Sequence, residues 1–385
     1  MDCICIIHFL EWPRAVRLGG MKGLVALAAA MGIGRFAFTP ILPMMQADAG
    51  LTVAQGGWLA SANYLGYFVG ALSIMAMRWS TSTAVRIGLV VVGAATLAMG
   101  FLSEFTVWMA LRFVAGVASA WVLVSVSAHT ARGDGPVTFA GVGAGIAFAG
   151  LACLALMAAH ANSTHAWQVL GAGAFAAAAI VWNGFGSEPA IDAAQAPPAQ
   201  AGPWTPDTLR MVACYGIFGF GYIIPATFLP AMARQAVSDP VVFGLSWPVF
   251  GTAAALSTLA VGVLHRTVPD RKVWILGHLV MAAGVVVPLA WPGLAGIVAA
   301  AMLVGGTFMV VTMAGMQEAR RVAGADARKV VATMTAAFAA GQIAGPLLVS
   351  GMASLPAGFS ISLAASGILL AVSAALLTFT PRRSP

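Results

Sequence analysis

Residues 293–317 read GLAGIVAAAMLVGGTFMVVTMAGMQ and contain no ionisable side chain. A helix of about 20 apolar residues is long enough to cross the hydrocarbon core of a bilayer, so this segment predicts a transmembrane helix. Similar runs recur along the whole chain, which predicts an all-α polytopic membrane protein. The twelve predicted spans are 22–46, 54–77, 85–103, 105–130, 137–159, 166–186, 208–232, 241–264, 273–291, 293–317, 328–352 and 358–380.

Composition excludes most other protein classes. Among 385 residues, 60% are apolar and only 8% are charged, whereas a soluble domain carries about a quarter charged residues. These counts exclude a soluble enzyme, and they exclude collagen, coiled coils and intrinsic disorder as well. The formal charge of +7 indicates basic cytoplasmic loops rather than nucleic-acid binding. The four cysteines lack the spacing of a metal site, so we expect neither a metal nor a cofactor.

The basic residues predict the orientation in the membrane. Of the 19 Lys and Arg residues, sixteen lie on one side of the bilayer if the N-terminus is cytoplasmic, and Arg234 alone lies on the other. The remaining two, Arg35 and Arg112, fall within spans. Because basic loops face the cytoplasm, both termini are expected there, which requires an even number of spans.

Residues 188–207 (EPAIDAAQAPPAQAGPWTPD) interrupt the apolar pattern. Prolines among small residues disfavour a helix and predict a flexible cytoplasmic linker. This linker divides the chain into two bundles of six helices, at residues 22–187 and 208–385.

The first residues of the chain, 1–21, form a short leader that we set apart from the fold. Its apolar stretch is broken by His8 and Glu11, and it lacks the cleavage pattern of a signal peptide. Met21 stands directly before the first span, so we expect it to be an alternative start of translation.

The first span of each bundle carries a related sequence. Residues 32–45 read GIGRFAFTPILPMM and residues 219–232 read GFGYIIPATFLPAM, which match at an offset of 187. The fifth span of each bundle carries a Gly-x-x-x-Gly pattern, at 141–145 and 341–345. Two pseudo-symmetric six-helix halves in the same orientation are the architecture of major facilitator transporters.

Two of these segments carry a family resemblance. The segment at 32–45, followed by GWLASANYLGY at 57–67, resembles the YbfB/YjiJ family of bacterial major facilitator transporters. The fourth span, from Arg112 to Gly116, is similar to the Arg–Gly motif of that superfamily. The resemblance implies alternating-access transport in the bacterial inner membrane, and it names no substrate.

The loop between the eighth and ninth spans is similar to a superfamily loop motif. It contains Gly262, Arg266, Asp270 and Arg271. The resemblance implies that these residues form a conformational latch, in which basic side chains contact a neighbouring helix end.

Arg35 and Arg112 are the two charges expected inside the bilayer. Arg35 lies about 20 Å above the cytoplasmic face and Arg112 about 10 Å below the outer face, at 1.5 Å per residue. In a core about 30 Å thick, these are the same depth. Two guanidinium groups at one depth predict a clamp for a carboxylate or phosphate. For each arginine the alternative is a structural role, tying its helix to neighbouring carbonyls.

Three neutral polar residues share that depth: Asn63, Tyr222 and Gln342. Tyr222 occupies the repeat position of Arg35, so the N-terminal half would bind an anion and the C-terminal half would supply hydrogen bonds. Each of the three could instead form a bond between helices, worth about 1 kcal/mol. No Asp or Glu lies in the middle of a span, which disfavours cationic substrates and leaves coupling to a proton open.

These observations predict a secondary active transporter for a small solute, with an organic anion as the favoured class. The leading alternative is multidrug-type efflux of neutral amphipathic compounds, in which the arginines would be structural. A remote alternative is a membrane sensor or scaffold that transports nothing. Besides its substrate, the chain is expected to contact the lipid bilayer, and no polar constellation indicates a membrane enzyme.

Overall fold

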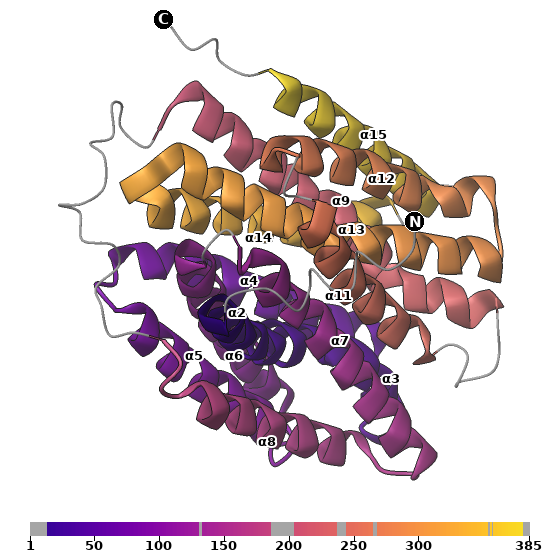
Figure 1. Ribbon diagram of the computed structural model, residues 1–385. Coiled ribbons are helices and arrows are strands. Elements are labelled where there is room, and N and C mark those ends of the chain that lie inside the picture. Colours follow the sequence, from indigo (N-terminus) through magenta and orange to yellow (C-terminus); the bar gives the residue numbers. More distant parts are fainter. Residues whose placement is uncertain are drawn as a thin grey trace, which may run out of the picture.

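The computed structural model describes residues 14–130, 133–185, 204–236, 244–264, 268–352, 355 and 357–379. Every regular element in these ranges is a helix, and the long helices pack side by side (Figure 1). The elements are α2 (Arg14–Leu27), the π-helix η1 (Ala28–Phe36), α3 (Phe38–Asp48), α4 (Val53–Ala76), α5 (Thr81–Ala98), α6 (Phe105–His129), α7 (Gly135–Ala158), α8 (Ser163–Val181), α9 (Pro206–Ala236), α11 (Ser246–Leu264), α12 (Asp270–Ala290), α13 (Leu294–Ala323), the 3₁₀ turn η2 (Gly324–Asp326), α14 (Ala327–Met352) and α15 (Gly358–Thr378).

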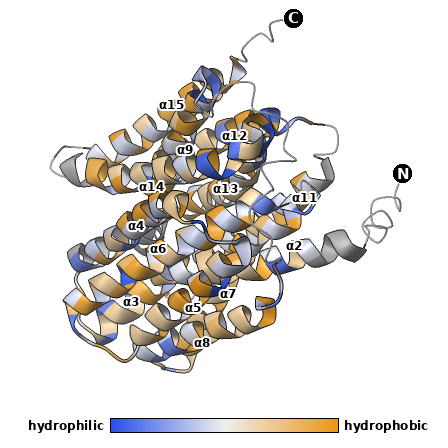
Figure 2. Cartoon of the chain, turned by 90° about the vertical axis from the view of Figure 1, so that its left-hand side faces the viewer, coloured by the Kyte–Doolittle hydropathy of each residue, from blue (hydrophilic) through white to orange (hydrophobic). Residues whose placement is uncertain are grey.

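The helices have the length and composition of membrane spans. Within the described residues, 10 stretches are long and apolar enough to cross a bilayer, and one of them, Leu294–Val349, contains both α13 and α14. Apolar colour runs along the helices in Figure 2. Exposed apolar side chains such as Ile180 (72%) and Ile368 (64%) are suited to lipid. The all-helical membrane fold is therefore confirmed, while the count of twelve spans stays a prediction because α11 is not among these stretches.

Several predicted boundaries coincide with local stop signals. Glu104 is the residue before α6, and Gly293, with φ of +99°, precedes α13. The predicted linker lies outside the described residues over 188–203, and α9 begins at Pro206. Likewise, residues 1–13 of the predicted leader lie outside them, and α2 already begins at Arg14.

Glycines bring helices into contact in the same way in both predicted halves. A Cβ added at Gly145 of α7 would collide with the backbone of Ala28 in the first helix. A Cβ at Gly341 of α14 would collide with the backbone of Gly216 in α9. The Gly-x-x-x-Gly patterns of the fifth span in each half therefore serve the same packing. This match supports the division at 22–187 and 208–385, which stays a prediction.

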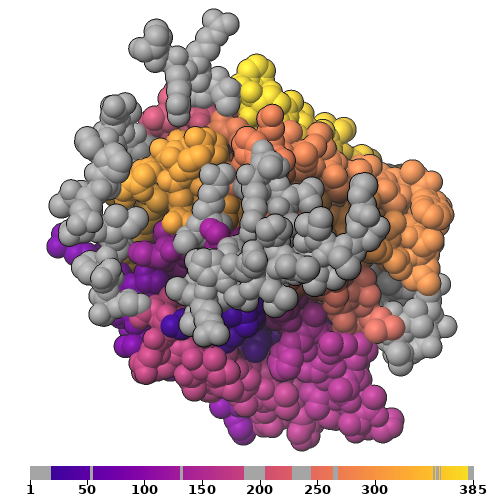
Figure 3. Space-filling model, in the orientation of Figure 1, coloured from indigo at the N-terminus to yellow at the C-terminus, as the bar shows by residue number. Residues whose placement is uncertain are grey.

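The N-terminal helices α2–α8 meet the C-terminal helices α9–α15 along an interface that we call the seam. Figure 3 shows one face of the molecule as a space-filling view. It is formed chiefly by α7 with α11 and by α4 with α14. Gly262 of α11 abuts Pro136 at the first turn of α7, and Pro248 of α11 abuts Gly150 near the other end. The seam between α7 and α11 is thus packed along most of its length.

Replacing Gly145 by alanine tests the glycine packing. We expect Gly145→Ala to lower stability by about 1–3 kcal/mol, the usual cost of overpacking, because the new Cβ meets backbone that cannot move aside. Gly57→Ala is the matched control, since a Cβ there has nothing within 4 Å. Thermal unfolding in detergent measures both variants, and equal melting temperatures would contradict the packing argument.

Candidate functional site

The first span is not a regular α-helix, because the π-helix η1 lies in its middle and two prolines follow. In a π-helix the carbonyl of residue i accepts from the N–H of residue i+5. For Arg35 that residue is Pro40, which has no N–H. Arg112 of α6 supplies a donor for this carbonyl from Nη2 (3.0 Å), and its Nη1 donates to the neighbouring carbonyl of Gly34 (3.1 Å).

Two neutral side chains complete this attachment. Asn63 of α4 donates from Nδ2 to the carbonyls of Gly34 (3.3 Å) and Arg112 (2.8 Å). Ser119 of α6 donates from Oγ to the carbonyl of Ala30 (2.6 Å). Asn63 and Ser119 are completely buried. Backbone carbonyls in a dry interior need donors, so these side chains hold the irregular segment to α4 and α6.

The side chain of Arg35 lies on the seam and is only 3% exposed. Its Nη2 donates to Oε1 of Gln342 on α14, and its Cζ lies 3.8 Å from the ring centroid of Tyr67. Its Nε and Nη1 are buried without a hydrogen-bond partner. Among the described residues, Arg35 forms no ion pair. The buried guanidinium therefore lacks an acidic partner and retains free donors.

Gln342 connects Arg35 to the C-terminal helices. Its Nε2 donates to the hydroxyl oxygen of Tyr222 on α9 at 2.5 Å. The ring of Tyr222 is stacked between Phe308 and Phe338, with centroids 4.6 and 5.3 Å away. The resulting chain from Arg35 through Gln342 to Tyr222 crosses the seam inside an aromatic layer.

The structure brings all five predicted substrate-binding residues to one region, in two groups. Arg112 and Asn63 face the backbone of the first span, whereas Arg35, Gln342 and Tyr222 meet on the seam. Whether these residues bind substrate stays a prediction. Tyr67 was not among the predicted site residues, because packing was favoured for it over stacking on a ligand, although it follows Asn63 by four residues on one helix.

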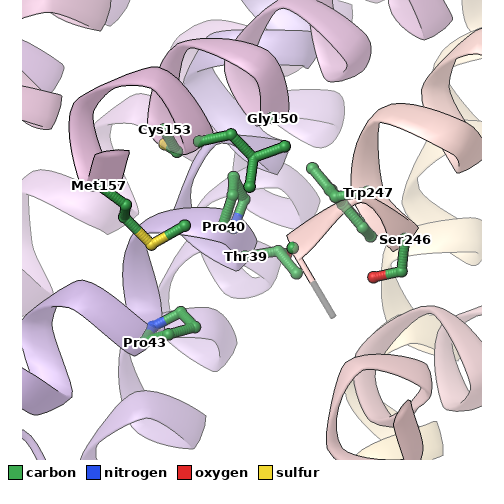
Figure 4. Close-up of a pocket in the computed structure, with 10 residues that line it drawn as sticks. Thr39, Pro40, Pro43, Gly150, Cys153, Met157, Ser246 and Trp247 are labelled. Carbon is green, nitrogen blue, oxygen red and sulfur yellow. The ribbon is translucent and has the colours of Figure 1, made fainter. Parts of the chain in front are cut away.

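A small pocket lies beside this group, between α3, α7 and α11 (Figure 4). Its cavity volume is about 20 Å³, and its wall is mainly apolar. Trp247 of its wall lies 6.4 Å, centroid to centroid, from the ring of Phe36, the neighbour of Arg35 in the chain. The pocket is therefore one aromatic layer away from the guanidinium. Its lining residues are Thr39, Pro40, Pro43, Gly150, Cys153, Leu154, Met157, Gly244, Ser246 and Trp247.

The residues of the predicted latch lie in different surroundings. Arg271 pairs with Asp207 of α9 (2.6 Å) and Glu318 of α13 (2.9 Å), which ties three C-terminal helices together. Gly262 packs on α7 across the seam, and Asp270 is buried in the first turn of α12.

Arg266 lies outside the described residues. A latching role for this loop stays a prediction. Asp207 had been assigned to the linker, and Glu318 lies one residue beyond the predicted span 293–317, so neither was expected to pair with Arg271.

The two buried arginines should differ in their contribution to stability. Arg112→Met removes two charge-assisted bonds and leaves the carbonyl of Arg35 without this donor, while Asn63 still donates to the carbonyl of Gly34. We expect a loss of about 3 kcal/mol. Arg35→Met removes a single bond to Gln342 together with an unpaired charge, so its melting temperature should fall much less. Thermal unfolding of both variants in the same detergent tests this order, and a larger loss in Arg35→Met would contradict it.

Comparisons with known proteins agree with this fold. A family model described as "Uncharacterised MFS-type transporter YbfB" matches residues 27–378. The crystal structure of the human organic anion transporter MFSD10 (TETRAN) is similar, with a TM-score of 0.72 and 13% identity over 95% of this chain and 100% of that chain. No curated protein matched the chain. Because the family model covers most of the sequence, the chain belongs to the YbfB family of major facilitator transporters and is a multi-pass membrane protein with a transport role.

Proposed function

We propose that the protein is a secondary active transporter of a small organic anion, and that Arg35 is the primary contact for the anion. The observation that carries this proposal is a guanidinium on the seam that is 3% exposed and has two unpartnered nitrogens. A buried charge without a partner is costly. A carboxylate fits the planar fork of arginine and would offset this cost.

The contacts of the two arginines favour a single negative charge on the substrate. Arg112 already donates both terminal nitrogens to the backbone. Arg112 keeps only its Nε without a partner, whereas Arg35 keeps both Nε and Nη1, so we expect the anion at Arg35, which carries one positive charge. We accordingly favour monocarboxylates over dicarboxylates. In this proposal Arg112 holds the backbone of the first span and does not contact the anion.

The surroundings of Arg35 favour an anion with an apolar or aromatic body. The rings of Tyr67, Tyr64 and Phe36 lie 3.8–5.8 Å from its Cζ. Tyr222 and Gln342 offer the main hydrogen-bonding groups from the opposite side. The similar human protein is described as an organic anion transporter, which supports the same substrate class.

Binding at this position would connect the substrate to both sets of helices. Arg35 belongs to the N-terminal set, and Gln342 and Tyr222 belong to the C-terminal set. An anion that takes the place of Gln342 on Arg35 would contact both, which couples its binding to rocking of the halves in alternating access. The excess of basic residues on one side supports an inner-membrane orientation with cytoplasmic termini.

Efflux of neutral amphipathic compounds is the second candidate. The observation that favours it is the apolar pocket of Figure 4, with Pro40, Leu154, Met157 and Trp247 in its wall. An uncharged apolar molecule would be suited to such a wall. In that case Arg35 would serve only to bind Gln342 across the seam.

A thermal-shift screen separates the two candidates. Purified protein is heated in detergent with benzoate, acetate, succinate, benzamide or benzylamine. We expect benzoate to raise the melting temperature more than succinate or benzamide, because the site offers one free guanidinium among aromatic rings. Arg35→Gln should abolish the shift, and proteoliposomes containing this variant should lose uptake of labelled benzoate.

Arg86→Gln is the matched control for removal of one arginine charge. Arg86 on α5 donates to the carbonyl of Trp182 at the surface of the N-terminal bundle. This bond involves no residue of the seam. This variant should retain the benzoate shift. Equal stabilisation by benzamide and benzoate in both wild type and Arg35→Gln would contradict the anion site and support neutral efflux.

A further inference from the structure

A second group of cations lies where α6, α13 and α14 reach the predicted cytoplasmic side. It consists of Arg320 in the last turn of α13 and Arg328 at the start of α14, beside the imidazole of His129 at the end of α6. We call it the cationic cluster. Both arginines lie near enough to His129 to act on it electrostatically. The cluster therefore joins N-terminal and C-terminal helices at one end of the seam.

The cluster has no acidic partner among the described residues. The neighbouring acids are already paired, Glu318 with Arg321 (2.7 Å) and Asp326 with Lys329 (2.9 Å). No ion pair of the described chain includes His129, Arg320 or Arg328. Concentrated positive charge without acids is the electrostatic character of an anion site.

Buried donors of the cluster also lack acceptors. Arg328 donates from Nη1 to the carbonyl of Trp79 after α4 (3.2 Å), but its Nε and Nη2 are buried without a partner. His129 contacts Thr81 and the carbonyl of Ser125 through Nδ1, so its N–H is already bonded and Arg328 holds the free donors. An unsatisfied buried polar group is costly, so this arrangement is suited to an acceptor rich in oxygen.

The surroundings of the cluster favour a lipid as the source of that acceptor. Trp79 and Trp121 pack edge to face 5.2 Å apart beside it, and Trp is enriched where a membrane meets water. On the adjoining face of α4, Leu72 is 39% and Met75 is 37% exposed. An acyl chain could lie on these apolar side chains while its headgroup reaches Arg328.

We propose that the cationic cluster binds the phosphate of an anionic phospholipid. Arg328 supplies a planar donor fork, and Arg320 supplies further positive charge. Basic pockets between transmembrane helices on the cytoplasmic side are suited to such headgroups. Because the cluster spans the seam, a bound headgroup would hold the ends of α6, α13 and α14 together. This inference is independent of the substrate bound at Arg35.

The test measures lipid binding to the purified full-length protein in a neutral detergent. Phosphatidylglycerol should raise the melting temperature, whereas phosphatidylcholine at the same concentration should not. Arg328→Gln should weaken phosphatidylglycerol binding at least tenfold, as measured by native mass spectrometry of the lipid-bound protein. Lys272→Gln is the matched control, because Lys272 is an exposed cation at the first turn of α12, and it should bind the lipid as the wild type does.

Three outcomes would overturn the proposal. The first is equal binding of phosphatidylglycerol to Arg328→Gln and wild type, and the second is equal stabilisation by phosphatidylcholine. The third is full stabilisation by millimolar inorganic phosphate without lipid, which would make the ligand a soluble anion. Arg320→Gln provides a second variant if Arg328→Gln does not fold. Arg35→Gln should retain the lipid effect, so failure of the anion-transport proposal is distinguishable.

Discussion

Backbone carbonyls that lose their intrahelical donors inside an apolar bundle need donors from elsewhere, and the site of this protein depends on that constraint. Pro40 leaves the carbonyl of Arg35 without its π-helical donor, and Arg112 binds this carbonyl and that of Gly34. Asn63 and Ser119 add further donors. These bonds fix the first span to α4 and α6, and they thereby place the side chain of Arg35 on the seam.

The same constraint explains why two arginines at one depth have different roles. Both Nη groups of Arg112 donate to the backbone and only its Nε lacks a partner, so we assign this arginine mainly to structure. Arg35 contacts an aromatic ring and one amide, so its charge remains available. The C-terminal helices are joined at one end by ion pairs of Arg271 with Asp207 and Glu318. Each set of helices thus has its own polar attachments, and the Arg35–Gln342 bond is a polar link between the sets.

The sequence predicted the helical fold because unbroken apolar runs of about 20 residues have few alternatives in a membrane. Counting residues within spans also placed Arg35, Arg112 and Gln342 at one depth, where the structure brings them together. The residue count could not predict the hydrogen-bond partners of these side chains. Those partners depend on how each helix is rotated and on the π-helix, and neither can be inferred from residue spacing. For the same reason Asp207 was assigned to the linker and Tyr67 to packing, because the roles of both arise from tertiary contacts.

The central claim is that Arg35, and not Arg112, meets the anion. Nitrogen-15 NMR of the arginine Nε–H groups tests it most directly, with the two signals assigned by Arg35→Lys and Arg112→Lys. Titration with benzoate should shift the Arg35 signal saturably and leave the Arg112 signal in place, because the Nη groups of Arg112 stay on the backbone carbonyls. A saturable shift of the Arg112 signal, or no shift of either, would contradict the account.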